Sequence, residues 1–165
     1  MKFFGKKKSG YTMIELLFYI SIFAVVFLIM INSIIVMTRS FREASINTDI
    51  IQSSGIMDRI SREIRKAESI NTINTSDLKL NTTNDAGTAT TVQFSLSGSN
   101  IIFYDNDVLL GNLNSPNISV TSLSFTQITT AKGTAVKVFM TVLSNNYGSN
   151  RSENFYNTIV LRGNY

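Results

Sequence analysis

The sequence contains no cysteine, no histidine and no tryptophan, and a single proline among its 165 residues. Without cysteine there is no disulfide, and without cysteine or histidine the thiol nucleophiles, the Ser-His-Asp and Cys-His relays and the thiolate or imidazole zinc sites are excluded. A domain built from this chain must therefore be held together by apolar burial and strand pairing. We expect no enzymatic activity, no catalytic residues, no metal-binding residues and no cofactor.

Positive charge is concentrated at one end of the chain. The formal net charge is +4, from 15 basic and 11 acidic side chains. Lys2, Lys6, Lys7 and Lys8 account for the whole excess, so residues 11–165 carry 11 basic and 11 acidic side chains. A formally neutral remainder lacks the broad basic surface with which proteins hold nucleic acid, so no direct nucleic-acid binding is predicted.

A long apolar run follows the basic segment. The 23 residues from 16 to 38 carry no formal charge and are mostly Leu, Ile, Phe, Val and Met, enough for a helix to span about 30 Å of hydrocarbon. Glu15 stands at the start of this run, where a carboxylate is poorly solvated and is taken as functional by default. Because basic flanks stay cytoplasmic, we expect a single-pass protein with a cytoplasmic N-terminus, a periplasmic or extracellular C-terminal domain, and membrane lipid around the run.

An ordinary secretory signal explains this segment less well. A removable signal peptide has an apolar region of about 7–15 residues and then a small-residue cleavage site. Here the apolar run is longer, and residues 37–41, at its end, offer no such site. An uncleaved single-pass anchor stays open as an alternative, although it explains neither Glu15 nor the glycine at position 10.

A second helical pattern follows, because between residues 46 and 67 apolar or small side chains recur at spacings of three and four. These residues are Ile46, Ile50, Ser53, Met57, Ile60, Ile64 and Ala67. The basic residues between 59 and 66 fall largely off this stripe, and we interpret them as a solvated face rather than a phosphate-binding patch. Gly55 lies inside this half, where a bend, close packing or simple tolerance is expected. We predict one continuous helix from about Tyr11 to Glu68.

After the helix the period of the apolar pattern changes to two, which is typical of strands. Residues 69–91 are interpreted as a linker with one short strand near residues 78–80. Strands are then expected at residues 92–97, 101–104, 108–110, 118–127, 135–143 and 155–162. A turn at residues 97–100 makes the first two a hairpin, and a change of phase predicts a bulge near residues 121–122. The predicted fold class is α+β, a long N-terminal helix packed on an antiparallel β-sheet.

Two polar features of the strand region allow competing interpretations. Asp105, Asn106 and Asp107 supply the oxygens that calcium prefers, but calcium takes six to eight of them, and a plain hairpin turn is favoured. Arg162 either pairs across a subunit interface or caps an edge strand, and the structural role is preferred.

The segment Lys6-Lys7-Lys8-Ser9-Gly10-Tyr11-Thr12-Met13-Ile14-Glu15 resembles the prepilin signal of type IV pilins and type II secretion pseudopilins. The shared features are a short basic leader ending in glycine, an aromatic or apolar first mature residue and an acid four positions later. The resemblance implies that a prepilin peptidase cuts between Gly10 and Tyr11, that the new amine of Tyr11 is N-methylated, and that Glu15 pairs with such an amine on a neighbouring subunit. Tyr11 departs from the phenylalanine more common in the family but keeps an aromatic ring.

The same resemblance implies a pilin-like division of the chain. We expect a leader peptide at residues 1–10, a transmembrane and filament-core helix at 11–38, an amphipathic extension of that helix at 39–68 and a β-rich globular head at 69–165.

The amphipathic segment 57–67 and the closing segment 155–162 are similar to those of W-type minor pilins and J-type pseudopilins, whereas K-type pseudopilins lack the acid found at Glu15. The resemblance implies a minor structural subunit of a type IV pilus, type II secretion or competence-type filament that helps to prime or cap assembly. The partners implied are other pilins or pseudopilins, the prepilin peptidase and the inner-membrane assembly platform. The protein would lie in the inner or cytoplasmic membrane and then in a pilus or pseudopilus. A major pilin and a membrane-anchored extracytoplasmic binding or adhesin domain are the alternatives.

Overall fold

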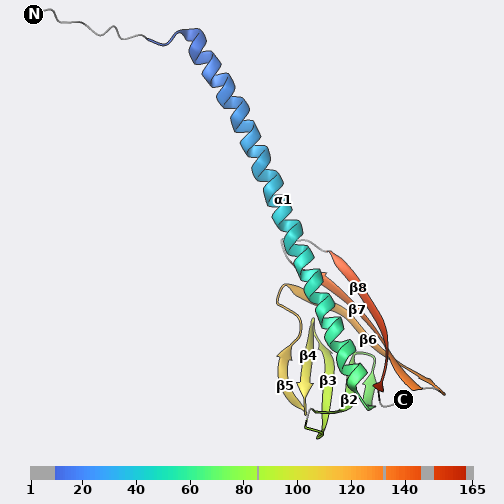
Figure 1. Cartoon of the computed structure of the whole chain (residues 1–165). Coiled ribbons are helices and arrows are strands. Elements are labelled where there is room, and N and C mark those ends of the chain that lie inside the picture. Colours follow the sequence, from blue (N-terminus) through green and yellow to red (C-terminus); the bar gives the residue numbers. More distant parts are fainter. Residues whose placement is uncertain (1–9, 85, 132, 146–150, 163–165) are drawn as a thin grey trace, which may run out of the picture. The chain divides into compact units, whose positions relative to one another are not determined.

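The computed structural model describes residues 10–84, 86–131, 133–145 and 151–162. Within these ranges the chain forms one helix, α1 (Met13–Lys66), followed by strands (Figure 1). The strands are β1 (Ser69–Asn74), β2 (Asp77–Thr83), β3 (Ala89–Ser97), β4 (Asn100–Asp105), β5 (Val108–Asn112), β6 (Ile118–Thr130), β7 (Gly133–Ser144) and β8 (Ser152–Val160). The chain divides into two compact units, Met1–Phe41 and Arg42–Tyr165.

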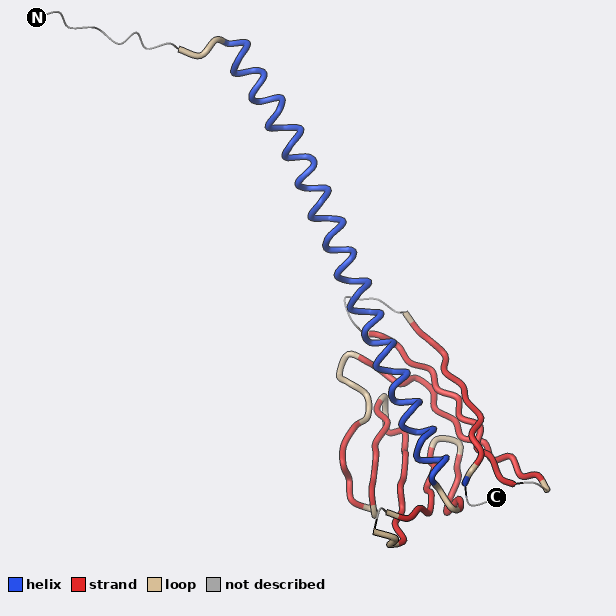
Figure 2. The backbone as a smooth tube through the Cα atoms, viewed as in Figure 1, coloured by secondary structure: helices blue, strands red, loops and turns tan. Residues whose placement is uncertain are grey.

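The α+β fold class is confirmed, with a long N-terminal helix and antiparallel strands. The strands are divided between two sheets, however, where the sequence predicted one. A five-stranded sheet has the order β1-β2-β3-β4-β5, and a three-stranded sheet has the order β6-β7-β8. Figure 2 shows the strands in red and the helix in blue. The backbone N–H of Phe125 donates to the carbonyl of Thr75 at 2.9 Å, and that of Val120 donates to the carbonyl of Ser99 at 2.9 Å, which ties β6 to two turns of the five-stranded sheet.

The apolar stripe of α1 forms the centre of the core in the unit Arg42–Tyr165. All seven residues predicted for the stripe are buried except Ile50, which is partly exposed. Ile60 and Ile64 have no exposed surface, and they belong to one cluster with Phe94 of the five-stranded sheet and Val138 of the three-stranded sheet. The helix therefore supplies apolar surface to both sheets at once.

The helix continues through Gly55, and the glycine does not serve close packing. It lies within the continuous helix α1 and is exposed, and no heavy atom of a neighbouring element lies within 4 Å of the position that its Cβ would occupy. Simple tolerance of glycine on a solvent-facing position is the explanation that fits.

The linker predicted at residues 69–91 is wrong, because β1, β2 and the start of β3 occupy most of it. The segment is rich in Asn, Thr and Ser, which is typical of a linker. Its threonines, however, also favour strands. One face of β2 is nevertheless apolar enough to be buried, through Leu78 and Leu80. β1 then pairs with β2 as a polar edge strand in which only Ile70 and Ile73 are partly buried.

The turns and the bulge predicted farther along the chain are confirmed. The hairpin of β3 and β4 turns at Gly98, which has a φ of +61°. Asn106 and Asp107 have φ values of 53° and 63°, the backbone of a two-residue turn between β4 and β5. The Asp107 carboxylate accepts from the ammonium of Lys79 at 2.6 Å, which supports the plain-turn interpretation. The strand register shifts between Val120 and Ser122, at the expected bulge.

Every second residue in the middle of β7 faces the core, as expected of a strand. Val136, Val138, Met140 and Val142 are all buried. Arg162 follows β8 and is exposed, and among the described residues it forms no ion pair. Leu161, directly before it, is 1% exposed and belongs to the core cluster, so packing at this end of the chain comes from the leucine.

A buried amide joins the starts of β4 and β6. Asn114 lies in the loop between β5 and β6 and is 7% exposed. Its Oδ1 accepts from the backbone N–H of Ile101 at 2.9 Å, and its Nδ2 donates to the carbonyl of Ile118 at 2.7 Å and to the Oδ1 of Asn100 at 2.9 Å. One side chain therefore satisfies polar groups of both sheets in a place that water does not reach.

We predict that a fragment of residues 42–165 folds without detergent and that Ile60→Ala or Ile64→Ala lowers its free energy of unfolding by about 2–5 kcal/mol, because each substitution leaves a cavity in the core. Urea unfolding followed by circular dichroism measures this. Ile51→Ala is the matched control, since Ile51 is 69% exposed on the same helix and should change stability by no more than about 0.5 kcal/mol. Core variants with the midpoint of the unsubstituted fragment would show that the stripe is not the core face.

We also predict that Asn114→Ala destabilises the same fragment by about 1–3 kcal/mol, because it leaves buried backbone groups without partners. Asn114→Asp keeps the acceptor for Ile101 but loses the donor, and is expected to be at least as damaging. Asn117→Ala is the control, because Asn117 is exposed in the same loop. Equal stabilities of the Asn114→Ala and Asn117→Ala fragments would contradict the bridging role.

Candidate functional site

The predicted processing site lies at the start of α1. Gly10, Tyr11 and Thr12 precede the helix, and Tyr11 is 77% exposed. No heavy atom lies within 4 Å of the position that a Cβ on Gly10 would occupy. The peptide bond between Gly10 and Tyr11 is thus in open, non-helical backbone, the kind of segment that proteases cut most readily. The leader lysines lie outside the described residues.

Thr12 fixes where the helix begins and therefore where Glu15 stands. The backbone N–H of Glu15 donates to the carbonyl of Thr12 at 3.1 Å and lies 3.3 Å from its Oγ1. This places Thr12 at the N-cap and Glu15 at the third helical position, the spacing of a capping box. An acid in the first turn also faces the positive end of the helix dipole. The site of the carboxylate is therefore set by local helix chemistry.

The aromatic residues around Glu15 lie on the same side of the first turns. The hydroxyl of Tyr19 is 3.4 Å from the Oε1 of Glu15, too long for a strong hydrogen bond. The rings of Tyr11 and Tyr19 meet edge to face with their centroids 6.5 Å apart, an arrangement that aromatic pairs prefer. None of the ion pairs formed among the described residues includes Glu15. Any cation that pairs with this carboxylate therefore lies outside the ion pairs of the described residues.

The helix surface beyond Glu15 is apolar and uncovered. α1 is long and apolar enough to cross a membrane, with a mean hydropathy of 2.8 over its most apolar 18-residue window, and none of that window is buried within the chain. Large apolar side chains such as Phe18, Phe23 and Leu28 are 61–70% exposed. Apolar surface of this extent requires lipid or protein around it.

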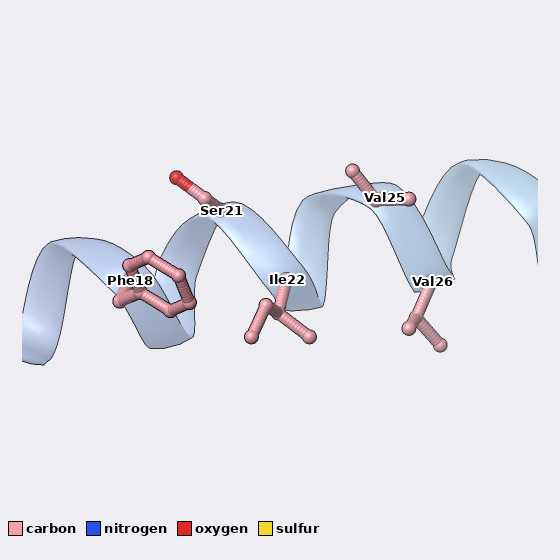
Figure 3. A pocket seen from close by; sticks show the side chains of 5 residues that line it. All are labelled: Phe18, Ser21, Ile22, Val25 and Val26. Atoms are coloured by element: carbon pink, nitrogen blue, oxygen red, sulfur yellow. The ribbon is translucent and has the colours of Figure 1, made fainter.

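Two shallow depressions lie along this part of the helix. The first is formed by Phe18, Ile22 and Val26 in one row and by Ser21 and Val25 in the adjacent row (Figure 3). The second is lined by Ile29, Asn32, Ser33, Val36 and Met37. Asn32 is the residue that the sequence analysis missed, although a polar amide within a long uncharged run is a visible signal. Formal charge alone does not reveal it, because an amide is neutral.

The described residues contain no cluster of metal-ligating side chains. The described residues contain no group of three or more acidic, histidine or cysteine side chains close enough to share a metal ion. A polar hollow is lined by Glu68, Ser69, Ile70, Gln127, Thr134 and Leu161. It offers a single carboxylate, fewer charged oxygens than calcium sites use.

A family model for the prokaryotic N-terminal methylation motif matches residues 5–31 of the chain. The match includes the open Gly10–Tyr11 bond, Glu15 and most of the apolar run. No curated protein and no solved structure matches the chain.

Proposed function

We propose that this type IV pilin-like protein is a minor structural subunit, either a minor pilin or a pseudopilin, of a type IV pilus, type II secretion or competence-type filament. The observation that carries the proposal is the methylation motif at residues 5–31, directly ahead of an apolar helix whose surface the chain leaves uncovered. The motif and the helix support the pilin-like class, as the resemblance implied. The motif indicates a structural protein, whose task is assembly rather than catalysis.

The motif and the apolar helix indicate membrane anchoring, and the charge pattern supports a direction for it. Lys6, Lys7 and Lys8 stand on one side of the span, and short basic flanks stay in the cytoplasm. The unit Arg42–Tyr165, which contains both sheets, then lies in the periplasm or outside the cell.

Leader removal supplies the positively charged partner that Glu15 lacks. Cleavage after Gly10 by the prepilin peptidase converts the Tyr11 nitrogen from an amide into a free amine, which is then methylated and stays cationic. A carboxylate enclosed by apolar helices without a cation is expensive. We therefore assign Glu15 to an ion pair with the amine of an adjacent subunit, formed as the assembly platform moves the subunit into the fibre with other pilins.

The minor role rests on the amphipathic segment 57–67 and the closing strand, the features shared with W-type minor pilins and J-type pseudopilins. In the structure this segment is the last part of α1, and Met57, Ile60 and Ile64 within it are buried. A minor subunit is expected at low abundance and in filaments that contain other pilins. A major pilin would instead be abundant and polymerise alone.

We predict that the mature protein begins at Tyr11 and carries one extra methyl group, because Gly10 ends the leader in open backbone. Mass spectrometry of the membrane fraction measures both changes. Gly10→Leu is the test variant, since a bulky side chain replaces the glycine that the motif requires at the cleavage point, and it should leave the leader attached. Recovery of only the full-length chain from cells with an active prepilin peptidase would exclude this function and leave the anchored binding domain.

We further predict that Glu15→Ala leaves membrane insertion and leader removal intact but lowers incorporation into filaments about tenfold or more, since loss of a buried ion pair partner leaves the amine uncompensated. Incorporation is measured as the ratio of the protein in sheared filaments to that in membranes, or by crosslinking to partner pilins. Tyr19→Phe is the control, because it removes only the hydroxyl 3.4 Å from Glu15 and should incorporate like the unsubstituted protein. Equal incorporation of Glu15→Ala would show that Glu15 is a tolerated acid at the membrane edge.

A further inference from the structure

One face of the membrane part of α1 carries a regular seam. Its members alternate spacings of three and four residues, the pattern of a heptad repeat. They are Glu15, Phe18, Ile22, Val25, Ile29, Asn32 and Val36. Both shallow depressions of this helix lie along the seam, the first around Phe18, Ile22 and Val25 (Figure 3) and the second around Ile29, Asn32 and Val36. All the apolar members are exposed.

Asn32 is the polar exception within the apolar stretch of this seam. Among the described residues its amide forms no hydrogen bond, whereas two hydroxyls near it in the run are satisfied by their own helix. The hydroxyls of Ser33 and Thr38 each donate at 2.9 Å to a carbonyl four residues earlier. Asn32 lies about 24 Å along the helix from the start of the uncharged run and about 9 Å before its end. Lipid tails cannot satisfy an amide at this depth, so its partner has to be a polar group on a neighbouring helix.

We propose that a second copy of this chain covers the seam, parallel and in register, with Asn32 of each copy bonded to Asn32 of the other. Two copies in one membrane share their orientation, so identical residues stand at equal depth. The Asn32 amide carries both a hydrogen-bond donor and an acceptor, so the amides of two copies can each donate to the other. Ile22, Ile29 and Val36 occupy every second seam position, so the amide pair would lie between apolar contacts of the two copies.

The paired seam also bears on Glu15, and this step rests on the function proposed above. In-register copies bring two Glu15 carboxylates to the same end of the pair. Before leader removal these acids repel each other, and afterwards each copy brings one amine of Tyr11 for one acid. The Asn32 pair thus fixes the register of the two helices. The balance of charge near Glu15, at the start of the helices, depends on leader cleavage.

The absence of cysteine makes the seam directly testable, since any introduced thiol is unique in the chain. The full-length protein is produced in membranes with one cysteine on the seam, Val25→Cys or Val36→Cys, or with one on the opposite face, Phe27→Cys or Ile34→Cys. Mild oxidation should give disulfide-linked dimers of twice the monomer mass from the seam variants, in several-fold higher yield than from the opposite-face variants. Similar yields from all four positions would overturn the proposal.

Substitutions at Asn32 in the Val36→Cys background test the amide itself. Asn32→Leu should lower the dimer yield about 3- to 30-fold, the range expected for an interhelical amide pair, and Asn32→Gln should retain part of it. Thr38→Val is the control, because the Thr38 hydroxyl is bonded within its own helix and points away from the seam. An unchanged yield with Asn32→Leu, or a product whose mass shows a different chain, would overturn pairing between copies. The N-terminal mass of the same samples reports leader removal separately, so failure of the processing step is not mistaken for failure of the pairing.

Discussion

Burial of the α1 stripe beneath both sheets is the constraint on which the unit Arg42–Tyr165 depends. The five-stranded and three-stranded sheets contribute Phe94 and Val138 to one core cluster, and Ile60 and Ile64 of the helix lie fully buried in the same cluster. Direct backbone bonds between the sheets are few, which leaves the helix as their common apolar partner. With no disulfide available, loss of packing on this stripe removes the main force that holds the sheets together.

The two parts of α1 satisfy their polar side chains in different ways. In the head part, Asp49 is 5% exposed and accepts from the Ser144 hydroxyl of β7 at 2.7 Å, so a buried acid is solvated from within its own chain. In the membrane part, Asn32 has no such bond among the described residues, and Glu15 has only the long contact with Tyr19. Polar groups that a chain leaves unsatisfied in an apolar setting indicate partners outside it. The first part of the helix is therefore suited to contacts between subunits, and the second to folding.

The sequence predicted the features that rest on strong periodicity or on special backbone. The stripe of α1, the alternation of β7 and the turns at Gly98 and Asn106 all follow from side-chain spacing or from residues that accept positive φ. The division into two sheets was not predictable, because alternation shows which face of a strand is buried but not which strand lies beside it. β1 was missed because a polar edge strand has no apolar pattern to reveal it. Of the candidate site, the motif indicated Gly10, Tyr11 and Glu15, whose roles stay predictions, whereas Asn32 carries no charge and belongs to no motif.

Tyr11 directly precedes the helix whose first turn carries Glu15, and the proposed cleavage would make its nitrogen a free amine. Thr12 caps the helix, so the nitrogen of Tyr11 stays outside the helical hydrogen-bond ladder and remains available once the leader is gone. The ring of Tyr11 packs edge-on against Tyr19, the residue whose hydroxyl approaches Glu15. The ring of Tyr11 and the carboxylate of Glu15 therefore both lie beside Tyr19 on the first turns of the helix. In the proposed assembly Glu15 pairs with the amine of an adjacent subunit, and enclosure by apolar helices strengthens that attraction because it lowers the local dielectric.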